Sequence, residues 1–175
     1  PAKVNLYKIV YKGAGSFHAW TQALNGFAVN VASFRGKTDA RFKASDNKYN
    51  IGIPATAHNV VAVGAYVNRA SYTDILGRSQ QGLNYNKQAV GALAFFSSVG
   101  PTLDGRTKPE FSAPGLNVAS SLSRYASVDS TEMLDANTAV FSGTSMSCPF
   151  TAGAVALYLE QHPEATYAEL TAAID

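Results

Sequence analysis

One serine lies where the sequence predicts the start of a helix. Ser145 belongs to residues 143–149, Gly-Thr-Ser-Met-Ser-Cys-Pro, which run straight into a small-residue apolar segment at 152–159. The start of a helix offers unpaired backbone N–H groups and the positive end of the helix macrodipole. Both favour an alkoxide or oxyanion charge beside Ser145. The pattern therefore predicts a nucleophilic serine at the N-terminus of a buried helix.

The residues around Ser145 indicate how this helix is built. Gly143 supplies a permissive backbone and Thr144 is a plausible cap, so we expect a helix from about Ser145 to Gln161. The His-Pro pair at 162–163 ends it, because a residue that precedes proline is disfavoured in the helical region. A capping box at 166–169, Thr-Tyr-Ala-Glu, predicts a second helix that starts near residue 167.

A nucleophilic serine needs a base, and the histidines of this chain are weak candidates. The sequence has three: His18, His58 and His162. None is accompanied by an aspartate in a context that would orient it, so each is interpreted as structural. Their spacing does not match a zinc site, and the single cysteine, Cys148, excludes an internal disulfide and a multi-cysteine metal site.

The apolar pattern predicts the strands that would carry the helix. Residues 59–67 form a nearly unbroken apolar, β-branched run, which is typical of a strand buried on both faces in a parallel sheet covered by helices. Further strands are expected, with a turn at 113–115 and irregular polar stretches between them. The predicted strands are residues 3–12, 27–34, 92–98 and 116–121, and the polar stretches are 68–91 and 122–137. The composition shifts near residue 50, so residues 1–50 and 51–175 are treated as separate parts.

Composition excludes several classes of function. Hydrophobic residues make up 46% of the chain and charged residues 15%, which is a globular composition. The 14 basic and 12 acidic residues give a formal net charge of +2, and no basic run is interleaved with aromatics, so nucleic acid is not an expected partner. No apolar run reaches the roughly 18–20 residues of a membrane span.

Four segments, in order, resemble the C-terminal half of the catalytic domain of subtilisin-like serine peptidases. Residues 143–149 with Ala152-Gly153 resemble the nucleophile signature of that family. Residues 54–65 resemble the strand that precedes it, and residues 96–110 with Ala113-Pro114-Gly115 resemble the stretch between them. Together these segments cover about residues 51–163.

The resemblance implies a fold and a mechanism. It implies an α/β fold, part of a doubly wound, mostly parallel sheet of subtilisin-like type, with residues 1–50 as a β-rich insertion or the start of the fragment. It also implies a serine endopeptidase with an Asp-His-Ser triad, in which Ser145 attacks a peptide carbonyl and its backbone N–H is one oxyanion donor. Gly143, Thr144, Met146 and Pro149 would support the nucleophile loop. Phe150 departs from the family, which usually has histidine there, and the change affects helix packing.

The motifs of the catalytic aspartate, histidine and oxyanion asparagine do not occur in this sequence. We therefore expect a fragment truncated at both ends, with residues 51–175 as the C-terminal half of the catalytic domain and little activity alone. Its expected partners are a peptide or protein substrate, and either the missing N-terminal half of the domain or a second copy that covers an exposed sheet.

The remaining expectations concern location, cofactors and alternatives. The family implies a secreted or extracytoplasmic protein. No cofactor is expected; structural calcium occurs in the family, but Asp39, Asp46 and Asn47 lack regular calcium-loop spacing. A non-catalytic subtilase-like binding or structural module remains the alternative. An esterase of the Gly-x-Ser-x-Gly type fits poorly, because Ser147 stands where the second glycine is needed.

Overall fold

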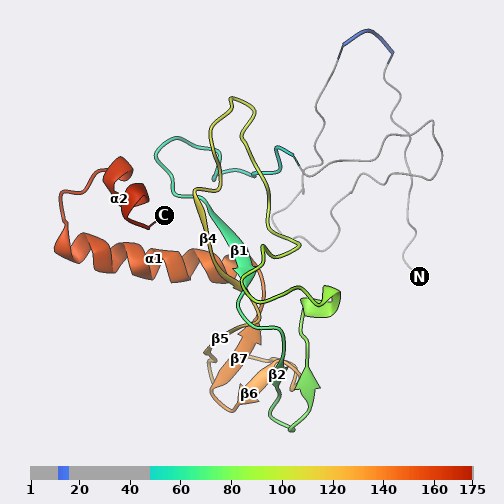
Figure 1. Ribbon diagram of the computed structural model, residues 1–175. Coiled ribbons are helices and arrows are strands. Elements are labelled where there is room, and N and C mark those ends of the chain that lie inside the picture. Colours follow the sequence, from blue (N-terminus) through green and yellow to red (C-terminus); the bar gives the residue numbers. More distant parts are fainter. Residues whose placement is uncertain (1–11, 16–47, 175) are drawn as a thin grey trace. The chain divides into compact units, whose positions relative to one another are not determined.

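The computed structural model describes residues 12–15 and 48–174 (Figure 1). The chain divides into two units, Pro1–Asp46 and Asn47–Asp175, and each is considered by itself. In the first unit residues 13–15 form a bend. The strands predicted at 3–12 and 27–34 lie outside the described residues, apart from Lys12, and so do His18 and the three residues considered for calcium.

A parallel pair of strands forms the centre of the second unit. β1 (Val63–Val67) pairs with β4 (Phe111–Leu116), with Ala65 opposite Ala113 (Figure 1). The predicted strand at 59–67 therefore begins four residues late. The reason is local: the N–H of Ala62 donates to a carboxylate oxygen of Glu110 at 2.7 Å instead of to a neighbouring strand.

Antiparallel pairs make up the remaining sheets of the described residues. β5 (Val118–Ser121), β7 (Thr138–Phe141) and β6 (Met133–Asp135) form one sheet in that spatial order, with β7 in the middle. β2 (Tyr72–Thr73) and β3 (Ser79–Gln80) form a short hairpin, followed by a 3₁₀ turn, η2 (Asn84–Asn86). The polar stretches at 68–91 and 122–137 thus contain short strands that their composition did not predict. Pairing with a neighbouring strand stabilises them although their residues have a low intrinsic strand propensity.

Two further predictions about strands were wrong. Residues 92–98 form a single bridge, between Leu93 and Tyr66, rather than a strand. Residues 113–115, predicted as a turn, lie inside β4. Pro114 is tolerated there because β4 pairs only with β1 among the described strands, and an edge strand can accommodate a residue that has no N–H.

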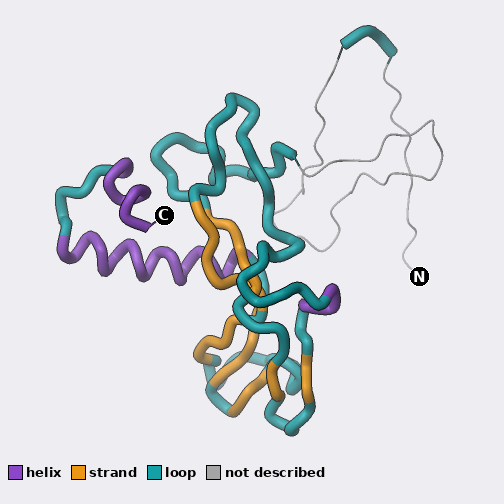
Figure 2. Tube along the Cα trace, in the orientation of Figure 1, coloured by secondary structure: helices purple, strands orange, loops and turns teal. Residues whose placement is uncertain are grey.

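The two helices begin and end close to the predicted positions (Figure 2). α1 spans Thr144–Gln161 and α2 spans Tyr167–Ile174, with His162 as the C-cap of α1. The predicted capping box of α2 is formed: the N–H of Thr166 donates to Glu169 at 2.8 Å, and the N–H of Glu169 donates to the Thr166 hydroxyl at 3.3 Å. The N-cap of α1 is Gly143, so the expectation that Thr144 caps it was wrong.

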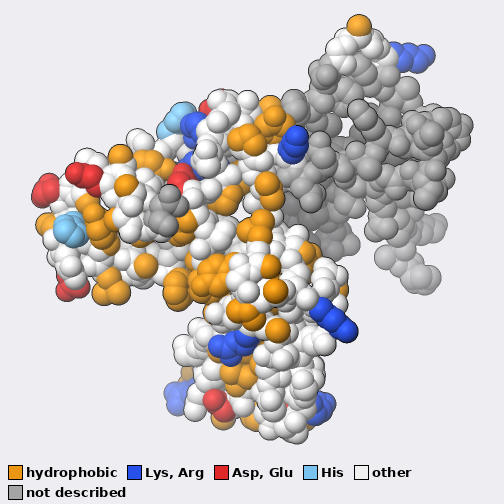
Figure 3. Space-filling view, viewed as in Figure 1, with side chains coloured by type: hydrophobic (Ala, Val, Ile, Leu, Met, Phe, Trp, Pro, Cys, Tyr) orange, Lys and Arg blue, Asp and Glu red, His pale blue; other side chains and the backbone are white. Residues whose placement is uncertain are grey.

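The second unit buries only one face of α1, so the prediction of a buried helix is wrong for the described residues. Ser147 and Thr151 are the buried residues of α1, and they face β4 and β1. Beside this buried stripe Phe150 is 58% exposed and Leu157 67% exposed. Hydrophobic side chains accordingly lie open on the surface of this part of the molecule (Figure 3).

The apolar core is small and sits on the parallel pair. Ala65 and Val67 of β1, Leu116 of β4 and Ala94 form its buried cluster. Mixed helix and strand content, with α1 against a parallel pair, is compatible with an α/β fold of subtilisin-like type. The doubly wound sheet and the β-rich N-terminal insertion stay predictions.

Candidate functional site

Ser145 lies in the first turn of α1, one residue after the helix begins. The N-cap Gly143 has φ 152° and ψ 162°, a conformation open essentially only to glycine. The N–H of Met146 donates back to the carbonyl of Gly143 at 3.0 Å, which closes the turn around Ser145. The Ser145 side chain is exposed, and neither its hydroxyl nor its N–H has a partner among the described residues.

β4 anchors the backbone on both sides of Ser145. Before it, the N–H of Gly143 donates to the carbonyl of Gly115 at 2.7 Å. After it, the fully buried hydroxyl of Ser147 lies 3.2 Å from the carbonyl oxygens of both Ala113 and Pro114. The position of Ser145 is therefore set by its neighbours in the chain, since its own hydroxyl has no hydrogen-bond partner among the described residues.

Close approach between α1 and β4 depends on Gly115. A Cβ at this position would lie 2.4 Å from the Cβ of Ala65 and 2.5 Å from the hydroxyl of Ser147. Ordinary carbon contacts are about 3.5–4.0 Å, so any side chain at residue 115 would push α1 and the strands apart.

A second link joins the turn before Ser145 to the junction between β4 and β5. The backbone N–H of Asn117 donates to the hydroxyl of Ser142 at 2.8 Å, and that hydroxyl lies 3.2 Å from Oδ1 of Asn117. Asn117 is fully buried, with φ 56°. The sequence predicts a strand through Asn117 and no role for Ser142. Asparagine itself was the signal for a turn at residue 117, because this residue type favours such turns.

The start of α1 has the chemistry that an oxyanion needs. The N–H of Ser145 points from the first turn of an 18-residue helix, where backbone N–H groups lack intrahelical acceptors and the macrodipole is positive. Pro149 has no N–H to donate to the carbonyl of Ser145 four residues earlier. This arrangement can stabilise negative charge beside the Ser145 hydroxyl.

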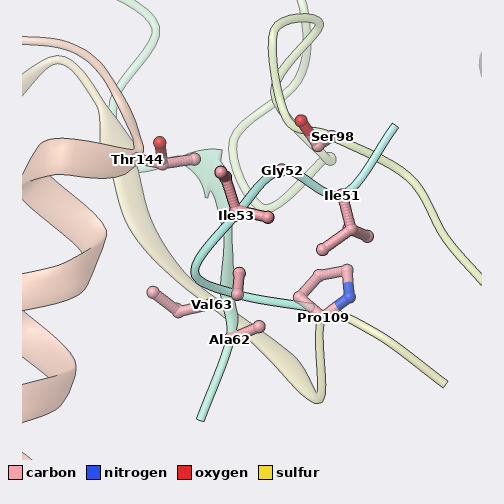
Figure 4. Close-up of a pocket in the computed structure, with 9 residues that line it drawn as sticks. Ile51, Gly52, Ile53, Ala62, Val63, Ser98, Pro109 and Thr144 are labelled. Atoms are coloured by element: carbon pink, nitrogen blue, oxygen red, sulfur yellow. The ribbon is translucent and has the colours of Figure 1, made fainter. Parts of the chain in front are cut away.

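A pocket of about 210 Å³ lies beside the start of α1 (Figure 4). Its wall combines the loop around Ile53, the beginning of β1 at Val63, Pro109 ahead of β4, and Thr144, the residue before Ser145. Most of the lining residues are of apolar type, with hydroxyl-bearing side chains at Ser98 and Thr144. Thr144 is the lining residue that connects the pocket to Ser145 along the chain.

A buried ion pair supports the far wall of this pocket. The Lys108 ammonium contacts Glu110 and the carbonyl of Val60; its side chain is 3% exposed and that of Glu110 15% exposed. The Tyr167 hydroxyl at the start of α2 donates to Glu110 at 2.5 Å. Burial raises the pKa of Glu110, but hydrogen bonds from Lys108, Tyr167 and the Ala62 N–H outweigh it and leave the pKa below its usual value. The pair joins the segments that lead into β1 and β4 to the start of α2.

The described histidines do not reach Ser145. His162 lies at the opposite end of α1, about 25 Å away at 1.5 Å per residue, and its ring packs against Tyr158 with centroids 4.6 Å apart. His58 is exposed in the loop before β1. Cys148 is an exposed free thiol, and Met146 is partly buried beside the serine.

The described residues contain neither a metal-ligand cluster nor a membrane-spanning helix. No group of three or more His, Cys, Asp or Glu side chains is arranged to hold a metal ion there. Within the same residues, no helix has both the length and the hydropathy needed to cross a bilayer.

Comparison with known proteins shows what the chain is similar to. It is 35% identical over 116 residues to an uncharacterized protein of Aquifex aeolicus, a match that covers 65% of this chain and 48% of that protein. It is 32% identical over 153 residues to the serine protease AprX of Bacillus subtilis, covering 85% of this chain and 28% of AprX. Pyrolysin of Pyrococcus furiosus is 34% identical over 119 residues, 62% of this chain and 8% of pyrolysin. The chain thus spans less than half the length of these relatives.

The family model agrees with these relatives. The model of the subtilase family matches residues 25–175, which include α1, β1, β4 and the pocket between them. Because this match covers most of the length of the chain, the chain belongs to the subtilase family.

Proposed function

We propose that this chain is part of a serine endopeptidase in which Ser145 is the nucleophile. Its backbone N–H is one oxyanion donor, and a histidine oriented by an aspartate accepts its proton. Those two residues, and a second oxyanion donor, would come from outside the present sequence. The observation that carries the proposal is the exposed Ser145 in the first turn of α1, with backbone anchors to β4 on both sides. Gly143, Thr144, Met146 and Pro149 would shape this turn.

The substrate would be a peptide or protein. The pocket lined by Ile53, Val63 and Thr144 is a candidate site for a substrate side chain, since most of its lining residues are apolar and Thr144 directly precedes the nucleophile. The serine protease AprX supports the reaction class, and the family supports a secreted or extracytoplasmic location. No cofactor enters this mechanism.

The apolar outer face of α1 supports a partner for this part of the chain. A helix that is apolar around its whole circumference is typical of a protein interior, yet Phe150 and Leu157 are exposed here. We propose that the preceding half of a doubly wound catalytic domain covers this face, with residues 1–50 as a β-rich insertion and 51–175 as the C-terminal half. A second copy of the chain is the alternative occupant.

Labelling with a fluorophosphonate probe tests the proposal. The complete protein should be labelled at Ser145, and Ser145→Ala should abolish the label. Residues 1–175 alone should react only weakly, because a serine hydroxyl without a base is a poor nucleophile. Strong labelling of the isolated chain would show that it contains its own base. A complete protein that is not labelled would favour the alternative, a non-catalytic binding or structural module, for which the supporting observation is that the Ser145 hydroxyl has no base beside it among the described residues.

A further inference from the structure

We propose that Asn117 is a positioning residue for Ser145. It couples the β2–β3 hairpin to the serine turn, which is the turn that begins at Ser142 and carries Ser145. The inference rests on the proposed function, since it assigns Asn117 a role in the reactivity of Ser145. Asn117 lies at the point where the chain leaves β4 and enters β5, next to the strand pair Val118–Phe141. Phe141 is followed directly by Ser142 and Gly143, so Asn117 is adjacent to the start of α1.

The backbone of Asn117 makes this position possible. Its φ of 56° is left-handed, a conformation that asparagine adopts more readily than most residues. The turn aims the N–H of Asn117 at the Ser142 hydroxyl, 2.8 Å away, while Oδ1 of Asn117 lies 3.2 Å from the same hydroxyl. Ser142 is therefore held by two contacts from one buried residue.

The other end of the Asn117 side chain binds the segment that carries the hairpin. Its Nδ2 donates to the carbonyl of Arg69 at 3.1 Å and to that of Gln81 at 2.9 Å. The side chain of Asn68 adds a contact to the Asn117 carbonyl at 3.4 Å. Arg69 precedes β2 and Gln81 follows β3, so one amide joins both ends of the hairpin to the serine turn.

Ser145 is sensitive to this link because it has few other constraints. Its side chain has no partner among the described residues, so its position depends on the anchors of the flanking backbone. The Ser147 hydroxyl holds the turn after Ser145, while the Gly143–Gly115 bond and the Asn117–Ser142 contacts hold the turn before it. Loss of the Asn117 contacts leaves the Gly143–Gly115 hydrogen bond and the pairing of Phe141 with Val118 to fix that side. Misplacement of a reacting group by about 1 Å can cost roughly 100-fold in rate.

Gly82 offers a way to displace Asn117 without changing it. A Cβ at Gly82 would lie 2.2 Å from Oδ1 of Asn117, so Gly82→Ala must push the amide away. Gly77, in the turn of the same hairpin, is the matched control. It also has a positive φ, 76° against 53° for Gly82, but a Cβ there would meet nothing within 4 Å. Both substitutions strain the backbone, and only one disturbs Asn117. Asn117→Gly provides a direct variant that keeps the left-handed backbone and removes the amide.

The experiment measures fluorophosphonate inactivation of the complete protein as separate kinact and KI values, well below the melting temperature of each variant. We expect Gly82→Ala and Asn117→Gly to lower kinact by about 10- to 100-fold with KI unchanged, and Gly77→Ala to keep the wild-type kinact. Lower melting temperatures with wild-type kinact in both test variants would show that Asn117 is merely structural and would overturn the inference. If the wild type is not labelled at Ser145, the proposed function fails instead and the inference falls with it.

Discussion

Substitution of Gly115 by alanine should separate α1 from the strands beneath it. The new Cβ would lie 2.4 Å from the Cβ of Ala65 and 2.5 Å from the Ser147 hydroxyl, whereas ordinary carbon contacts are about 3.5–4.0 Å. The gap must open by about 1 Å or more. Ala65 and Ser147 are both fully buried on packed elements, so neither can rotate away. Overpacking of this kind costs about 1–3 kcal/mol in the free energy of unfolding.

The same displacement should affect chemistry, because Ser147 anchors the turn that carries Ser145. We expect Gly115→Ala to lower the rate of fluorophosphonate labelling of the complete protein by about 10- to 100-fold. Urea denaturation measures the stability change, and labelling is compared at a temperature where both forms are fully folded. A variant that stays within about 0.5 kcal/mol of the wild type, the usual range for neutral surface changes, and is labelled at the wild-type rate would refute the reasoning.

The remaining predictions concern the ion pair and the outer face of α1. Glu110 has a folded-state pKa below its unfolded value of about 4.3, so its contribution to stability is complete above about pH 5 and is lost as the pH falls through the folded pKa. Urea midpoints between pH 6 and 3 should therefore fall more steeply in the wild type than in Glu110→Gln; parallel slopes would contradict this. Lys108→Met should destabilise the fold by about 3 kcal/mol, because it leaves the Glu110 carboxylate without its cation. A Cβ at Gly153 meets no atom of the described residues within 4 Å, so Gly153→Ala should stabilise α1 by about 0.5–1 kcal/mol in residues 1–175 alone. It should destabilise the complete protein if another half of the domain packs on that face, and stabilisation in both contexts would argue against such packing.

Local sequence determined the helices well. The ends of α1 and α2 follow from proline, the capping box and the glycine at residue 143, all of which act within a few residues. These signals need no tertiary context, since they depend on φ preferences and on hydrogen bonds across one turn. The placement of Ser145 in the first turn of a helix was predictable for the same reason. Its role as nucleophile stays a proposal.

The strands required the tertiary structure. Residues 92–98 have strand-forming composition but make only a bridge, while residues 113–115, which resemble a turn, lie inside β4. A strand exists where a partner supplies its hydrogen bonds, and a partner distant in sequence leaves no local signal.

What fixes the serine turn is likewise a property of the fold and not of the motif around Ser145. The sequence by itself determined the helix start, the glycine that permits it and the absence of a recognisable base. Only the tertiary structure brought Gly115, Asn117 and Ser147 together from segments up to 32 residues apart, where close backbone approach and buried hydrogen bonds hold Ser145 in place. Such contacts arise from the packing of segments that are distant in the sequence. The type of a single residue therefore does not reveal them.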